Sequence, residues 1–206
     1  GHSKNYGDYS LEIMLIFREH IDDTELIIWR IDESLEELLE ISLHHYDHEL
    51  EGISNITRQK ERIISRLLLE MIVGKKVEVK YEDSGKPICN GIHFSISHTK
   101  NYVAVIVGKT VMGVDIEFKN DRIFRVTEKF MHQDELKTLS ECTEKQKFAL
   151  LCWCAKETVF KMIDESGVDF AEMNCKIGSD KIILSYKNAD FILKYMDFTD
   201  FFVVFS

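Results

Sequence analysis

The chain has 206 residues, of which 45% are hydrophobic, enough for the core of one domain or two small halves and too many for a disordered chain. Its formal net charge of −10 opposes binding to nucleic acid, which requires clustered lysine and arginine. There is no run of about 18 apolar residues that could span a membrane, and no signal sequence precedes the first predicted strand. We therefore predict a soluble, cytoplasmic protein.

The first half of the chain is predicted to contain strands, two helices and a hairpin. The strands are predicted at residues 11–17, 24–31, 76–81, 92–97 and 102–107, the last two joined by a turn at Asn101. Ser34 and Glu37 have the spacing of a capping box, which predicts a helix from there to about residue 50. A second helix carries apolar residues at helical spacing between Ile63 and Ile72 and ends at Gly74.

The second half alternates in the same way between strands and helices. A strand is predicted at 111–118, short helices around 126–131 and 134–139, a long helix at 144–163, and strands at 176–187, 190–196 and 200–205. Strands and helices mixed in hairpin order predict the α+β class.

The five cysteines are an odd number without framework spacing, which is typical of a reducing compartment. Cys152 and Cys154 lie two positions apart in a helical pattern, so their side chains point about 200° apart. That spacing favours buried small side chains over a metal site.

Two acidic residues, Asp115 and Glu117, lie on one face of the strand predicted at 111–118, about 7 Å apart. Taken alone, such a pair is more typical of a solvated strand face. However, Gly113 would allow another backbone or a ligand to approach closely. Two like charges repel each other unless a cation lies between them, and Mg²⁺ prefers carboxylate oxygens.

Two further groups of polar residues have an ordinary and a functional interpretation. Ser97 and His98 end a strand at a hairpin turn, where they could be locally bonded or could bind an anion. Glu157 and Lys161, four residues apart on the long helix, could form an ordinary surface ion pair. A chain that contains the strand acids, the serine–histidine pair and the helix residues together is much rarer than a chain that contains any one of these groups.

The combined motifs resemble the 4′-phosphopantetheinyl transferase superfamily. The matching segments are Gly113-Val114-Asp115-Ile116-Glu117, Trp153-Cys154-Ala155-Lys156-Glu157 with Lys161, Gly85-Lys86-Pro87, and Phe94-Ser95-Ile96-Ser97-His98-Thr99. They are most similar to the surfactin-synthetase-activating type, whose members are monomers of two similar α+β halves related by a pseudo-twofold axis. The resemblance implies halves at residues 4–108 and 109–206.

The resemblance also implies roles for individual residues. Asp115, Glu117 and Glu157 match the carboxylates that bind Mg²⁺, with Mn²⁺ as an alternative metal. Lys161 matches a lysine that contacts the phosphate, and Glu135 aligns with a glutamate proposed as the general base, with Asp134 as the other candidate. The residues that match coenzyme A contacts are Lys86, Pro87, Ser97, His98 and Lys156. In the first half, basic residues could hold the 3′-phosphate, the candidates being Arg58, Lys60, Arg62 and Arg66.

The implied reaction moves the phosphopantetheine arm of coenzyme A to a serine of an apo acyl or peptidyl carrier protein and releases 3′,5′-adenosine diphosphate. Carrier proteins are usually acidic, so with a net charge of −10 docking would depend on a local patch. Phe124, Phe130 and Met131 could form this patch or belong to the core. Two alternatives stay open: a relic that binds carrier proteins without turnover, and a metal-dependent nuclease.

Overall fold

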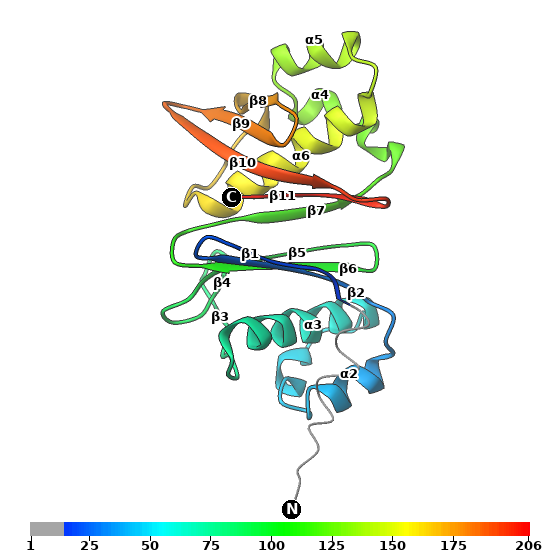
Figure 1. Cartoon of the computed structure of the whole chain (residues 1–206), viewed down its shortest axis with the longest axis vertical. Coiled ribbons are helices and arrows are strands. Elements are labelled where there is room, and N and C mark those ends of the chain that lie inside the picture. Colours follow the sequence, from blue (N-terminus) through cyan, green and yellow to red (C-terminus); the bar gives the residue numbers. More distant parts are fainter. Residues whose placement is uncertain (1–14) are drawn as a thin grey trace, which may run out of the picture. The chain divides into compact units, whose positions relative to one another are not determined.

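A computed structural model describes residues 15–206, which form two compact units (Figure 1). The first unit ends at Thr110 and the second comprises Val111–Ser206. Each unit contains its own sheet, helices and hydrophobic core, so the predicted α+β class is confirmed. Among the described helices, none is long and apolar enough to cross a membrane.

The first unit contains a four-stranded antiparallel sheet in the order β1-β2-β6-β5. Its strands are Leu15–Ile21, Thr24–Arg30, Tyr102–Gly108 and His93–Thr99, given in that order. The turns that join them contain Asp22 and Asn101, whose φ angles are 53° and 62°. The first strand was predicted at 11–17, and residues 11–14 lie outside the described residues.

Helix α3 packs against this sheet, and helix α2 packs against α3. Helix α2 comprises Leu35–Ile41 and begins with the predicted capping box of Ser34 and Glu37. Helix α3 comprises Ile56–Val73 and ends, as predicted, at Gly74, whose φ is 76°. The unit is completed by the 3₁₀-helix η1 (Asp47–Leu50) and by the short strands β3 (Lys80–Tyr81) and β4 (Pro87–Ile88).

Two predicted lengths in this unit were wrong. The helix expected to reach residue 50 ends at Ile41, because Leu43 and His44 adopt φ angles of 51° and 58°, outside the helical range. The strand expected at 76–81 is reduced to Lys80–Tyr81, the part that pairs with Pro87–Ile88.

The second unit contains a five-stranded antiparallel sheet in the order β7-β11-β10-β9-β8. These strands are Val114–Phe118, Phe201–Phe205, Ala189–Asp197, Lys181–Tyr186 and Asn174–Ile177, in that order. The strand predicted at 176–187 is therefore two strands, separated by a turn in which the Gly178 N–H donates to the Lys181 carbonyl.

The long helix α6 (Lys145–Met162) packs against this sheet and supplies the centre of the second core (Figure 1). Helix α5 (Gln133–Glu141) precedes it, and α4 (Thr127–Phe130) is a single short turn. The remaining elements are the 3₁₀-helices η2 (Asp121–Arg125) and η3 (Phe170–Glu172). The burial predicted for Cys152 and Cys154 is confirmed, and all five cysteines are free thiols.

Candidate functional site

Strand β7 and helix α6 bring the acidic motif residues together in the second unit. Asp115 is only 5% exposed and Glu117 is half-buried, so the solvated strand face considered above does not describe them. The close approach predicted at Gly113 is made by the helix itself, since a Cβ there would lie 2.3 Å from the Thr158 carbonyl oxygen. This contact places the last turns of α6 beside the carboxylates of β7.

Two side chains of α6 bond directly to these carboxylates. The Lys161 ammonium donates to the Asp115 carboxylate at 3.2 Å and to the Val114 carbonyl at 2.8 Å. The Trp153 indole N–H donates to the Glu117 carboxylate at 3.0 Å. Lys161 therefore bonds to strand β7. This partner differs from the ordinary surface ion pair with Glu157 that the four-residue spacing also allowed. The role of Trp153 was missed from the sequence, although its position one turn before Glu157 was visible.

The electrostatics of this group show negative charge that is incompletely neutralised. Burial and the Asp115 charge raise the pKa of Glu117 to about 8, against the opposing effects of the Trp153 hydrogen bond and Lys161. Burial and Asp115 also raise the pKa of Glu157, which Lys161 lowers in part. One ammonium group thus serves three neighbouring carboxylates, an arrangement that a divalent cation would stabilise.

The donor set fits the predicted metal. Three carboxylates offer only hard oxygen ligands, the type that Mg²⁺ and Mn²⁺ prefer, and contain no thiolate or imidazole that would favour zinc or copper. Asp115 and Glu117 on β7 and Glu157 on α6 therefore stay the residues predicted to hold the ion.

Glu135, predicted as the general base, lies in a different environment. One of its oxygens accepts the Lys156 ammonium at 2.6 Å and the His132 N–H at 2.9 Å, while the other accepts the Cys175 N–H at 2.7 Å. The side chains of Glu135 and Lys156 are fully buried. A carboxylate held in this way has no access to an external hydroxyl, and Lys156 has none to an external cofactor.

The same region contains a group of atoms that resembles a metal site. The thiols of Cys152 and Cys175 and a Glu135 oxygen lie within 4.8 Å of one another. The Lys156 ammonium already occupies the carboxylate, and burial raises the pKa of Cys152 well above its ordinary value, which keeps that thiol protonated. This cluster is therefore unsuited to a cation.

The first unit contains a cavity of about 670 Å³ whose lining is rich in cationic side chains. Arg58 and Arg62 come from α3, His98 from the end of β5, and Pro87 from β4. The structure therefore brings Pro87 and His98, two of the residues predicted to contact coenzyme A, into the lining of one cavity. Lys86 is exposed in the preceding turn, and Ser97 is buried within β5.

Arg66, one candidate for holding the 3′-phosphate, is buried and bonds to other side chains of the protein. It is 1% exposed and pairs with Glu49 at 2.5 Å, and it also donates to the Tyr81 hydroxyl at 2.8 Å. Its neighbour Arg62 lies over the Tyr81 ring, 5.1 Å from the centroid. Arg66 therefore has a structural role. Arg62 also lies 3.8 Å from the Glu49 carboxylate, and together with Arg58 it adds positive charge to the cavity lining. The contribution of Tyr81 was missed because no motif marks it.

The residues considered for carrier docking divide between surface and core. Phe130 and Met131 are buried in the core of the second unit, whereas Phe124 is 40% exposed. The Phe130 ring packs edge-on against Trp153 at 5.1 Å between centroids. Only Phe124 is therefore available at the surface.

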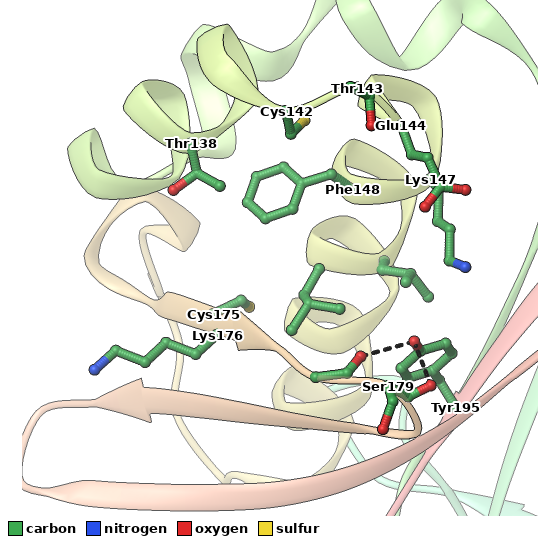
Figure 2. A pocket seen from close by; sticks show the side chains of 13 residues that line it. Thr138, Cys142, Thr143, Glu144, Lys147, Phe148, Cys175, Lys176, Ser179 and Tyr195 are labelled. Carbon is green, nitrogen blue, oxygen red and sulfur yellow. Dashed lines mark hydrogen bonds between the residues drawn. The ribbon is translucent and has the colours of Figure 1, made fainter.

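A second cavity, of about 580 Å³, lies in the second unit beside the start of α6 and strand β8 (Figure 2). The Tyr195 hydroxyl at its edge lies 2.8 Å from the carbonyl oxygens of Gly178 and Ser179, to which it donates. Lys147 on its rim pairs with Asp197 at 3.3 Å. These polar groups are bonded within the unit, so we assign the cavity no part in the site.

Comparisons with known proteins agree with this geometry. The family described as the 4′-phosphopantetheinyl transferase superfamily matches residues 111–193, the segment that contains the carboxylates and Lys161. The chain is also 28% identical, over 109 residues, to the 4′-phosphopantetheinyl transferase gsp of Aneurinibacillus migulanus. This alignment covers 50% of the chain and 46% of the relative, so the chain spans about half the length of that protein. The resemblance is thus confirmed for the second unit, whose residues 111–193 match the 4′-phosphopantetheinyl transferase superfamily.

Proposed function

We propose that the protein transfers the 4′-phosphopantetheine arm of coenzyme A to a serine of an apo acyl or peptidyl carrier protein, in a Mg²⁺-dependent reaction that releases 3′,5′-adenosine diphosphate. The observation that carries this proposal is the group of three carboxylates with Lys161 on β7 and α6. It lies within the segment that matches the superfamily.

The chemistry of the transfer suits these residues. When bound, Mg²⁺ would neutralise negative charge on the pyrophosphate. Lys161, held at the start of β7 by the Val114 carbonyl, adds a fixed positive charge at the same place. Trp153 fixes one Glu117 oxygen by its hydrogen bond and so orients that carboxylate.

The serine hydroxyl must lose a proton as it attacks the phosphorus atom. Glu157 would be occupied by the ion, and a bound cation lowers the pKa of the carboxylates that hold it. Glu135 is fully buried, and both of its oxygens are bonded within the unit. We therefore assign neither of these carboxylates as the proton acceptor and propose that water beside the three carboxylates takes the serine proton.

The arginine-lined cavity of the first unit is the site we propose for the nucleotide end of coenzyme A. Arg58 and Arg62 offer charge for its phosphates, and Pro87 offers an apolar surface for adenine. The monomeric state and the pseudo-twofold relation of the two halves follow from the resemblance and stay predictions. The cytoplasmic location, predicted from the sequence itself, also stays a prediction.

The decisive test is the intact mass of candidate apo-carrier proteins after incubation with coenzyme A and Mg²⁺. We expect a gain of one phosphopantetheine on a serine. Asp115→Ala and Glu157→Ala should each reduce the transfer rate at least about 100-fold with the fold intact, because each removes a charge required in the transition state. Glu141→Ala, which changes an exposed carboxylate on α5, is the matched control and should retain activity.

Other outcomes distinguish the alternatives. Calorimetric binding of the carrier with no requirement for coenzyme A or Mg²⁺, together with no mass gain, would indicate a relic. Mg²⁺-dependent cleavage of DNA or RNA without transfer would indicate a nuclease. Full activity of Asp115→Ala or Glu157→Ala would contradict the proposed site.

A further inference from the structure

Glu61 is an acidic residue in a cavity that is otherwise cationic. It lies on α3 and lines the cavity together with Arg58 and Arg62. Its side chain is 11% exposed, and its Oε2 lies 3.2 Å from Nδ1 of His98. Neither the sequence motifs nor the family resemblance singled it out.

Placing the Glu61 carboxylate in this cavity is energetically unfavourable in two ways. Burial raises the pKa of Glu61, while the charges of His98 and Arg58 act in the opposite direction. An anionic ligand in the cavity would also be repelled by this carboxylate. Such a residue is expected to be retained when its negative charge is used by a partner, and the partner in contact with it is His98.

The contact determines which histidine nitrogen is available to a ligand. His98 is exposed, with 56% of its side chain accessible, and lines the same cavity. A carboxylate at Nδ1 keeps a proton on that nitrogen and fixes the plane of the ring. Nε2 then remains as the nitrogen that can reach an anion, and in the charged ring it is a hydrogen-bond donor.

We propose that Glu61 is a positioning residue for coenzyme A, which binds Nδ1 of His98 so that Nε2 donates to the 3′-phosphate. This inference rests on the function proposed above. It predicts that Glu61 affects recognition of the 3′-phosphate and not the chemical step, because that phosphate takes no part in bond breaking. Glu61 would therefore distinguish coenzyme A from dephospho-coenzyme A, which lacks the 3′-phosphate.

Calorimetry with these two ligands tests the proposal on the full chain. Glu61→Ala should raise the Kd for coenzyme A about tenfold, the value of one charge-assisted hydrogen bond, and change the Kd for dephospho-coenzyme A less than about twofold. Glu61→Gln, whose amide oxygen can still accept from Nδ1, should fall between the parent and the alanine variant. Glu78→Ala is the control, since Glu78 is an exposed carboxylate of the same unit with 83% of its side chain accessible.

A double-mutant cycle shows whether Glu61 acts through His98. His98→Ala should weaken coenzyme A binding, and adding Glu61→Ala should weaken it no further. In transfer assays the Glu61 variants should raise KM for coenzyme A and leave kcat unchanged. The imidazole ¹⁵N resonances give a direct readout: the neutral ring of His98 should be protonated at Nδ1 in the parent and shift toward the Nε2 form in Glu61→Ala.

The outcomes separate this inference from the proposed function. A parent protein that neither binds coenzyme A nor transfers its arm contradicts the function itself. If the parent binds coenzyme A but Glu61→Ala weakens both ligands equally, or weakens binding further in the His98→Ala background, the positioning role is wrong. If Glu61→Ala fails to fold, the Kd values of Glu61→Gln for coenzyme A and dephospho-coenzyme A test the positioning role instead.

Discussion

Glu117 illustrates how the surroundings of one side chain change the proton affinity of an ordinary acid. Its position on strand β7 gives it Asp115 as a neighbour on the same face, and α6 covers it and supplies Trp153. Burial and the neighbouring charge together raise its pKa to about 8. The residue is thus largely protonated below about pH 8 in the metal-free protein, and a bound cation would favour its ionised form.

This shift predicts how the stability of the metal-free protein depends on pH. The unfolded chain releases this proton near 4.5 and the folded chain near 8, so between these values the folded state binds more protons. The free energy of unfolding should therefore fall as the pH rises through that window. Thermal unfolding in the presence of a chelator should show a smaller fall for Glu117→Gln than for the parent.

The same thermal unfolding measured with Mg²⁺ in place of the chelator tests the metal site. Because the ion binds the ionised carboxylates, it should stabilise the parent most at the upper end of this window and stabilise Glu117→Gln less. Parallel pH profiles for parent and variant without metal would show that the environment of Glu117 differs from the one described.

At the residue scale, the family resemblance grouped Asp115, Glu117 and Glu157, which their spacing alone could not do. The metal-binding role of these three carboxylates stays a prediction, whereas the surroundings of Glu135 depend on distant contacts. Nothing in the sequence around Glu135 indicates that its oxygens are taken by Lys156 and by a backbone N–H of β8. The local sequence pattern around a residue does not show which distant residues will bond to its side chain.

Among the elements, the junction of α5, α6 and β8 depends on the buried pair of Glu135 and Lys156. Glu135 caps the start of α5, pairs with Lys156 on α6 and accepts from Cys175 on β8. Both side chains are fully buried, so removing one partner leaves the charge of the other without compensation.

We therefore expect Glu135→Gln to reduce the free energy of unfolding by about 3–5 kcal/mol, while any folded enzyme keeps its transfer rate. The double variant Glu135→Leu with Lys156→Met should recover much of this loss because no unpaired charge remains. Glu165→Gln, which disrupts the exposed pair with Lys187, should have little effect on chemical denaturation. A stable Glu135→Gln enzyme that has lost transfer would restore Glu135 as the general base.

The elements themselves followed from periodicity and caps, and the errors are local. Helix α6 and the β5–β6 hairpin lie where apolar spacing and the Asn101 turn predicted them. The early end of α2 depends on left-handed conformations at Leu43 and His44, two exposed residues that no turn motif in the sequence marks.

At the scale of the whole molecule, the two proposed substrates meet opposite electrostatic conditions. The chain carries a net charge of −10, whereas the cavity proposed for coenzyme A is lined by Arg58 and Arg62. An acidic carrier protein should be repelled by the overall charge, and the phosphates of coenzyme A should be attracted by the local one. Salt screens both interactions over a distance of about 10 Å at 0.1 M.

Increasing the ionic strength from about 50 to 200 mM should therefore change the two Michaelis constants in opposite directions. We expect the KM for an acidic apo-carrier to fall about twofold, because screening weakens repulsion, and the KM for coenzyme A to rise by a similar factor. Initial rates at constant free Mg²⁺ measure both. Arg58→Gln should flatten the salt dependence for coenzyme A and leave that for the carrier unchanged. A carrier KM that rises steeply with salt would instead indicate docking through a basic patch that outweighs the net charge of the chain.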